Sequence, residues 1–599
     1  MRFFKIFLAA LLACVVASVV SIILWILVIC GVIASSGVVD STPMRSNSIL
    51  LLDLKEPIVD SPSSSLVSSF DLSTYSIKSQ FTLLDVIGLI ESAAEDGNIE
   101  GMLISPSVYA QVSTANLEEI RSAVERFKLT GKFVVGYADC YTQSGYYLAS
   151  VADELYLEPE GWVDWRGVAS TPIFYKGLLD KLNITIEAIR PAESRYKSAV
   201  EPYTRRDMSP ENRKQMQALV DSFWGSISSE VALSRGVSEL EMRSLTNRLD
   251  GLFAQDALKS GLVDELIYRD ELSSVYSRYG VELSQSGECS VVSLARYSQS
   301  RTKLPQTGRN AVGVIYAEGD IYQGRGSDGV YSESLISLIK EARSDNDIKS
   351  VVLRVNSPGG DALAADAIWR EVELLRREKP VIVSMGAAAA SGGYYIAAPA
   401  DLILADRTTV TGSIGVFGLF PYLGGALESK LGVTSDVVKS NSMADFASPL
   451  KPLTWEQKRL LQRRVDKVYD KFTSLVASGR NLSLEEVKQI AQGKVWSGEQ
   501  ALEIGLIDAI GGINSAIIIA ADKGGISSDF VIKEVVEEPQ GLDALLMFAQ
   551  MKISQYLGLD AKQSELKSLY DDYHQAQKAL SPIITEHGLV MYSPYRVEL

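Results

Sequence analysis

The sequence predicts an α/β fold made of two tandem βαβ units that follow an N-terminal transmembrane helix. Three observations support this prediction. Short β-branched runs alternate with helical patterns of about 11–17 residues, which is typical of crossovers in a largely parallel sheet. The stretch of chain that shows this alternation occurs twice, and its two copies match in sequence. A long apolar segment without charged residues precedes both copies.

Each unit is expected to alternate strands and helices. In the first unit these are a strand at 49–54, a helix at 83–94, a strand at 101–104, a helix at 116–127 and a strand at 132–137. The second unit repeats the order with a helix at 332–343, a strand at 351–355, a helix at 361–377 and a strand at 380–384. A further helix follows in each unit. Ser209 and Pro210 begin the first of these, and a capping box at Thr454 begins the second.

One stretch of the first unit matches a stretch of the second at a constant offset of 248 residues. Gly145-Tyr146-Tyr147 aligns with Gly393-Tyr394-Tyr395, and the match continues to Val168 and Val416. The units also end alike, at 256–264 and 500–508. These limits predict a cytoplasmic N-terminus and transmembrane helix at 1–44, a first repeat at 45–296, a linker at 297–310, a second repeat at 311–540 and a helical tail of open role at 541–599.

The apolar N-terminus predicts a single membrane span. No charged residue occurs from 6 to 39, whereas a spanning helix needs about 20 apolar residues and a signal-peptide core only about 7–15. Arg2 and Lys5 precede the span and Asp40 follows it, so the N-terminus is expected in the cytoplasm. The bulk of the chain would then lie on the periplasmic or extracytoplasmic side of a bacterial inner membrane. Cleavage as a signal peptide near Ala34 stays an alternative.

Composition excludes several classes of function. The net charge of -16 and the pI near 4.9 argue against nucleic-acid binding, which needs a basic surface. The four cysteines form no disulfide framework. Because the only two histidines are His574 and His587, near the C-terminus, no ordinary transition-metal site is expected in the repeats. The sequence has no phosphate-binding or dinucleotide fingerprint, so no cofactor is predicted.

A serine in the second unit is the candidate nucleophile. Ser413 stands between Gly412 and Gly415, which let its side chain project from a tight loop. Trp165 occupies the aligned place in the first unit, so only one copy keeps the serine. Ser391, within a run of small residues, is a second candidate, although such runs more often serve packing.

A glycine pair in the second unit is the candidate oxyanion hole. Gly359 and Gly360 follow a buried strand and precede a helix, where backbone N–H groups can point at an oxyanion. The alternative is a strand-to-helix turn that needs glycine only for its dihedral angles. The first unit lacks both the glycine pair and the serine, which fits the decay of a shared function.

The general base is expected to be a lysine from the first unit. A Ser-His-Asp triad needs an imidazole near the serine, and both histidines lie far beyond the repeats. A lysine can replace it where burial lowers its pKa and makes the neutral amine available. Lys197 is the candidate, because the second unit has no lysine at the matching place. Lys439 and Lys451 remain its rivals.

Taken together, these motifs resemble the long form of the bacterial signal peptide peptidase A family, also called protease IV. The resemblance runs from about residue 45 to 535 and includes Ser-Pro-Gly-Gly, Ala-Ser-Gly-Gly-Tyr-Tyr, Thr-Gly-Ser-Ile-Gly-Val-Phe-Gly and Tyr-Lys-Ser-Ala-Val-Glu-Pro. It implies a Clp/crotonase-type fold and a homotetramer tethered to the lipid bilayer. It also implies a Ser-Lys dyad endopeptidase that degrades cleaved signal peptides and other apolar peptides. By this resemblance Ser413 is the nucleophile, Lys197 the general base, and Gly359 and Gly360 the oxyanion hole.

Two other classes of function compete with a peptidase. An acyl-CoA enzyme of the crotonase type would share the fold, but CoA is a cytoplasmic cofactor and the chain is expected outside the cytoplasm. In a non-catalytic membrane scaffold, both copies would have lost their catalytic residues. Instead, each chemical element is kept once across the two units, which favours the enzyme.

Overall fold

The computed structural model describes residues 46–55, 57–62, 70–71, 76–77, 81–108, 112–284, 287–300, 310–537 and 590–592. The predicted transmembrane segment at 1–44, most of the predicted linker and nearly all of the predicted tail lie outside these ranges. Within the described ranges, no helix combines the length and the apolar character that a membrane crossing requires. The two repeats are described over most of their length, and each is built on its own sheet.

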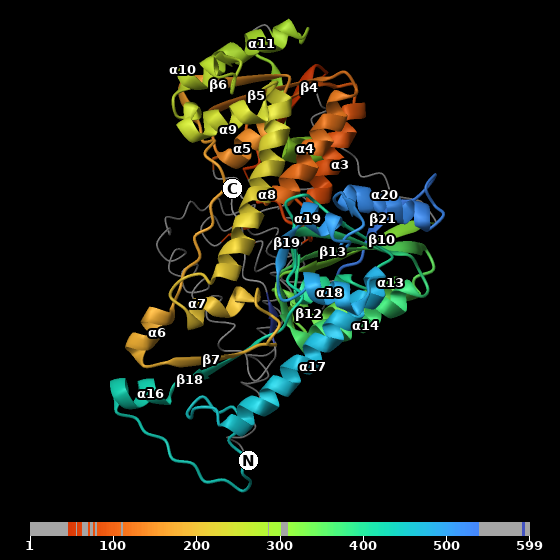
Figure 1. The fold of residues 1–599 in the computed structure, drawn as a ribbon. Helices are drawn as coiled ribbons and strands as arrows, with labels where there is room; N and C mark the ends of the chain where they lie inside the picture. Colours follow the sequence, from red (N-terminus) through yellow and green to blue (C-terminus); the bar gives the residue numbers. More distant parts are fainter. Residues whose placement is uncertain are drawn as a thin grey trace, which may run out of the picture.

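The first repeat contains a six-stranded parallel sheet (Figure 1). The strand order is β8-β6-β5-β4-β1-β9. The strands are β1 (Ser48–Leu52), β4 (Ile99–Ile104), β5 (Phe133–Tyr141), β6 (Glu154–Val163), β8 (Glu265–Leu266) and β9 (Ser290–Ser293), and the helices between them include α3 (Leu83–Glu95), α4 (Thr114–Lys128) and α5 (Gln143–Ala149). Strands β4 and β5 are largely buried apolar runs, as expected for parallel strands covered on both faces.

The second repeat contains a larger sheet with the path β19-β17-β15-β13-β10-β21, in which β16 pairs with β15 and β20 pairs with β16. The strands are β10 (Ala311–Glu318), β13 (Ile348–Ser357), β15 (Val381–Ala390), β16 (Leu402–Ala405), β17 (Val410–Gly412), β19 (Val495–Ser497), β20 (Ala509–Ile510) and β21 (Val531–Glu534). The helices include α13 (Ser332–Ser344), α14 (Ala362–Arg376), α15 (Gly392–Ala397) and α20 (Ile513–Lys523). All of these strand pairs are parallel except β17 with β19.

The sequence repeat corresponds to a structural repeat. The hydroxyl of Tyr146 donates to the carbonyl of Leu262 at 2.7 Å, and the hydroxyl of Tyr394 donates to the carbonyl of Leu506 at 2.8 Å. In both halves, therefore, the tyrosine motif fixes the segment that closes the repeat. This shared task explains why those two stretches of sequence match most clearly.

Most predicted elements are confirmed with small shifts in their ends. Ser209 caps α8 (Pro210–Arg235), and Thr454 forms a capping box on α17 (Trp455–Arg480). Two elements differ from the prediction. Strand β15 runs on to Ala390, beyond the predicted end at 384, because it pairs with β17 there. The glycine pair forms a short strand, β14 (Gly359–Asp361), which pairs with β11 (Ile321–Tyr322).

A segment of the first repeat leaves its own sheet and reaches the second repeat (Figure 1). It contains α6 (Lys176–Leu182), β7 (Thr185–Ile189) and α7 (Glu201–Thr204), and it returns through the long helix α8. Strand β7 pairs antiparallel with β18 (Gly418–Tyr422), with Ile189 opposite Gly418. Helix α8 packs its apolar face against β17 and β19 through Met216, Leu219 and Phe223. This route carries residues 190–209 to the second repeat.

A buried ion network also joins the two repeats. Arg354 of β13 is 1% exposed and contacts Asp60 at 2.9 Å and Glu119 of α4 at 3.0 Å. Asp406 is buried beside them. Burial, together with the neighbouring carboxylates, raises the pKa of Asp406 and of Glu119 above their usual ranges. The guanidinium is therefore the positive charge that lets these carboxylates stay inside.

We expect Arg354→Met to destabilise the chain by about 3–5 kcal/mol, because it leaves buried carboxylates without their counter-charge. Arg325→Met is the matched control, since Arg325 pairs with Glu333 at the surface, where such pairs contribute about 0–1 kcal/mol. Urea unfolding of both variants measures the difference. Equal midpoints for the two variants would contradict the role given to Arg354.

Candidate active site

Ser413 follows β17 in a backbone turn of left-handed conformation. Gly412 and Ser413 have φ angles of +74° and +50°, and such values are costly for a residue with a side chain. The Ser413 N–H donates to the carbonyl of Lys494 at 2.7 Å, and the Gly493 N–H donates to the carbonyl of Ile414 at 2.8 Å. These two backbone hydrogen bonds hold the turn, so the serine side chain has a fixed direction.

Lys197 reaches this turn from the first repeat. It lies between β7 and α7, and its side chain is 1% exposed. The amine nitrogen Nζ lies 2.9 Å from Oγ of Ser413. It donates to the carbonyl oxygen of Ser413 at 3.0 Å and to Oγ of Ser391 at 2.7 Å. Burial lowers the pKa of Lys197 well below its usual range.

These three contacts fit an uncharged amine, which has two N–H donors and one lone pair. The carbonyl of Ser413 can only accept, and Oγ of Ser391 directs its own proton toward the carbonyl of Gly415 at 3.4 Å. In the neutral form both N–H groups therefore have acceptors, which leaves the lone pair for the hydroxyl proton of Ser413; in the charged form the third N–H donates to Oγ of Ser413 instead. Among the described residues, no carboxylate pairs with Nζ of Lys197, and no group of three or more His, Cys, Asp or Glu is placed to hold a metal ion.

Ser391 has a place in this cluster that the sequence did not predict. The sequence offers it as a rival nucleophile or, more simply, as a small packing residue. In the structure it is fully buried with a φ of +57°, and its N–H donates to the carbonyl of Gly412 at 2.8 Å. Its hydroxyl accepts from Lys197, so the residue orients the amine. Nothing in the run of small residues distinguishes this role from packing.

A glutamine of the first repeat and a glycine of the second hold Lys197 in position. Gln215 of α8 is fully buried and donates to the carbonyl of Tyr196 at 3.0 Å and to Oγ of Ser198 at 2.6 Å. These bonds fix the backbone on both sides of Lys197. A Cβ on Gly493 would lie 2.5 Å from Cβ of Lys197, so only glycine allows this approach. Sequence reasoning missed both residues, because a helical amide and a loop glycine carry no chemical signature.

The glycine pair lies beside the same cluster. Gly359 has a φ of +107°, and a Cβ on Gly360 would meet the carbonyl oxygen of Ile321 at 2.2 Å. A Cβ on Gly392, the first residue of α15, would lie 3.1 Å from Cα of Gly359 and from N of Gly360. The Gly359 N–H donates a long hydrogen bond of 3.2 Å to Oγ of Ser357. The close packing accounts for the glycines, and their role as an oxyanion hole stays a prediction.

In the first repeat, the position that aligns with Ser413 belongs to the hydrophobic core. Trp165 is 2% exposed, and its indole N–H donates to Sδ of Met242 at 3.1 Å. Its ring also packs edge-on against Tyr146, with 5.2 Å between ring centroids. This copy therefore has a packed aromatic cluster where the second repeat has Ser413.

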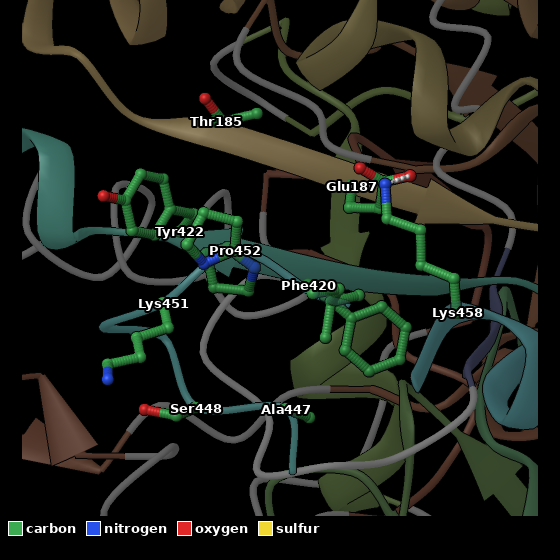
Figure 2. A pocket seen from close by; sticks show the side chains of 11 residues that line it. Thr185, Glu187, Phe420, Tyr422, Ala447, Ser448, Lys451, Pro452 and Lys458 are labelled. Atoms are coloured by element: carbon green, nitrogen blue, oxygen red, sulfur yellow. Dashed lines mark ion pairs between the residues drawn. The ribbon is translucent and has the colours of Figure 1, made fainter. Parts of the chain in front are cut away.

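The two rival lysines lie away from Ser413. Lys439 forms an ion pair with Asp445 at 3.0 Å. Lys451 lines a separate hollow of about 210 Å³ between β7, β18 and the start of α17 (Figure 2). A pair between Lys458 and Glu187, 2.9 Å apart, lies at the same hollow. Of the three lysines considered from the sequence, Lys197 is the one that the structure brings to Ser413.

Comparison with known proteins shows matches along most of the chain. The model of Peptidase family S49 matches residues 126–282 and 373–527, and the Clp protease model matches residues 306–403. Protease 4 of Haemophilus influenzae is 34% identical and covers 89% of this chain and 90% of its own length. Protease 4 of Salmonella typhi is 33% identical, with coverages of 87% and 85%. A chloroplastic serine protease SPPA of Arabidopsis thaliana is 32% identical, with coverages of 81% and 70%.

The Clp protease match supports the Clp-like α/β fold that the sequence resemblance implies. A solved structure of ClpP1 from Listeria monocytogenes covers 34% of this chain and 94% of that chain at 14% identity, with a TM-score of 0.24. That score is too low to add to the argument, which rests on the family model and on the parallel sheets described above.

The buried lysine predicts an unusual dependence of stability on pH. Its pKa is lowered on folding from an unperturbed value near 10.4, so between the folded and unfolded pKa values the unfolded chain binds more protons. Stability should therefore rise with pH across that window. Lys197→Met should raise the melting temperature at neutral pH, by about 1 °C for each kcal/mol gained in a chain of this size, and should flatten this slope. Lys451→Met, at an exposed position, is the control; an equal change in both variants would contradict the prediction.

Proposed function

The chain belongs to Peptidase family S49 and is a serine protease, and from this premise we propose that Ser413 is its nucleophile and Lys197 its general base. One observation carries the proposal: Nζ of Lys197 lies 2.9 Å from Oγ of Ser413 where both side chains are almost fully buried. A lysine can act as a base only in its neutral form, and burial favours that form. The acceptors on Ser391 and Ser413 leave its lone pair directed at the nucleophile.

In the proposed reaction, Oγ of Ser413 attacks a peptide carbonyl while the amine of Lys197 takes its proton. The ammonium then gives this proton to the leaving amine, and the acyl group stays on the serine. In the second half of the reaction the same amine takes a proton from a water molecule, whose oxygen attacks the acyl carbon. The ammonium then returns this proton to Oγ of Ser413 as the acyl–oxygen bond breaks, which restores the neutral amine. Negative charge develops on the carbonyl oxygen, and the backbone N–H groups of Gly359 and Gly360 are proposed to stabilise it.

We further propose that the substrates are cleaved signal peptides and other apolar peptides at the membrane. The motifs that resemble signal peptide peptidase A support this choice of substrate. The uncharged segment from 6 to 39 would anchor the enzyme at the bilayer, where such peptides accumulate after secretion. The charges around that segment would place the catalytic part on the extracytoplasmic side of a bacterial inner membrane.

We also propose that copies of the chain assemble into a ring. The family resemblance implies that this ring is a homotetramer. The extension at 164–209 of the first repeat docks on the second repeat of the same chain. The second repeat has its own extension after β18, which contains α16 (Gly424–Ala426) and extends away from both sheets (Figure 1). It exposes Leu431 and Val438 by 70% and 99%. By the internal repeat, this extension would dock on the first repeat of the next copy, and such head-to-tail contacts can close into a ring.

Ser413→Ala should abolish hydrolysis of a fluorogenic apolar peptide while leaving the melting temperature near that of wild type. Ser391→Ala should remain active with a rate reduced about five- to tenfold, because Lys197 loses one hydrogen bond worth about 1 kcal/mol. Both variants are assayed beside the wild type in the soluble part of the chain, from about residue 47. An inactive Ser391→Ala with an active Ser413→Ala would show that the nucleophile is assigned wrongly.

Peptidase activity should rise with pH through the lowered pKa of Lys197, since only the neutral amine can take a proton. Lys197→Ala should reduce the rate by about 10²–10⁴-fold and remove that rise. Lys197→Arg should not restore it, because a guanidinium stays charged at any pH that the protein tolerates. The pH–rate profiles of both variants test this. Near wild-type activity in the arginine variant would mean that the residue supplies only positive charge.

A further inference from the structure

The main chain of Lys494 holds the turn that carries Ser413. The Lys494 carbonyl accepts the Ser413 N–H at 2.7 Å, and the Lys494 N–H donates to the carbonyl of Ala491 at 2.9 Å. The next residue, Val495, begins β19 and pairs with Gly412 of β17. The backbone of Lys494 is therefore fixed on the side of the proposed nucleophile.

The side chain of Lys494 lies beside two aromatic rings, one from each repeat. Its Nζ is 3.4 Å from the ring centroid of Trp496 and 5.8 Å from that of Tyr196. A cation within about 6 Å of an aromatic ring is attracted by the negative face of that ring. Trp496 is fixed in turn, because its indole N–H donates to the carbonyl of Ile490 at 3.1 Å. Tyr196 belongs to the first repeat and directly precedes Lys197.

The two rings are the groups that offset the charge of Lys494. Burial, together with the nearby charge of Lys214, lowers the pKa of its amine. Among the described residues, no carboxylate forms an ion pair with this amine. Cation–π attraction is stronger where the cation is partly out of water, as this half-buried side chain is. The contact with the rings is therefore expected to hold the side chain in place.

Tyr196 is tied to the same segment of the second repeat through its main chain. Its N–H donates to the carbonyl of Gln492, two residues before Lys494, at 3.1 Å. The ring contact and this hydrogen bond thus join the residue before the base to the segment that holds the nucleophile. Because Tyr196 and Lys197 share a peptide bond, a shift of Tyr196 would change the distance of 2.9 Å between Nζ of Lys197 and Oγ of Ser413.

We propose that Lys494 is a positioning residue that sets the distance between Ser413 and Lys197. Its carbonyl fixes the turn of the nucleophile, and its ammonium group holds the ring of Tyr196 against the second repeat. The inference rests on the proposed peptidase function of Ser413 and Lys197. Loss of the ammonium group should therefore slow the chemical step and leave the binding of peptide unchanged.

The test compares Lys494→Met with Lys494→Arg in the full-length chain, with a fluorogenic apolar peptide and below the unfolding temperature of each variant. Methionine removes the charge, whereas arginine keeps a cation that can lie over the rings. Lys494→Met should reduce kcat about three- to tenfold with KM nearly unchanged, and Lys494→Arg should restore kcat to within about twofold of wild type. Lys467→Met, at an exposed position on α17, is the matched control and should behave as wild type. Wild-type kcat in Lys494→Met would overturn the proposal, as would an arginine variant as slow as the methionine variant.

The ring on the first repeat gives an independent measurement, which decides the matter alone if Lys494→Met does not fold. Tyr196→Leu should lower kcat by a similar factor, and Tyr196→Phe, which keeps a ring, should restore it. Lys494→Met combined with Tyr196→Leu should be no slower than Lys494→Met, because that variant has already lost the contact. Wild-type kcat in Tyr196→Leu, or additive losses in the double variant, would overturn the proposal. A Ser413→Ala chain that still hydrolyses the peptide would instead contradict the proposed function, whatever the Lys494 variants show.

Discussion

The burial of the Lys197 amine is the physical constraint on which the packing of the two repeats depends. The pKa of Lys197 stays lowered only while both repeats pack around it, since an exposed lysine would return to a pKa near 10.4. The β7–β18 pair, the face of α8 and the ion network around Arg354 all join the two repeats. A large hydrophobic core that includes residues of both sheets also keeps water out of the contact between the repeats.

Division of the site between two repeats explains several local features. Each half supplies part of the support for the other half's reactive group. Gln215 of the first repeat accepts an N–H from β19 of the second, while Gly493 of the second makes room for the lysine of the first. The first repeat could then fill its own serine position with Trp165 without loss of the shared site. Duplication followed by specialisation of each copy would leave such a proposed site with two contributors.

The sequence predicted the helices and strands that depend on a local pattern, and it predicted the candidate catalytic residues by elimination. The starts of α8 and α17, which are marked by caps, were predicted to the residue. Ser413 and Lys197 were selected because histidine was absent from the repeats and the two copies differed. Strand β14 and the last part of β15 were missed, because their small residues become strand only through pairing with distant segments. The roles of Ser391 and Gln215 likewise exist only in three dimensions, where contacts span about 194 and 280 residues.

The pairing of β7 with β18 joins strands from opposite halves of the chain. A ribosome completes the first of these strands long before it makes the second, so the proposed base exists for some time without its nucleophile. On the proposed assignment, the growing polypeptide therefore lacks its complete dyad until the second repeat has been made and has paired with the first.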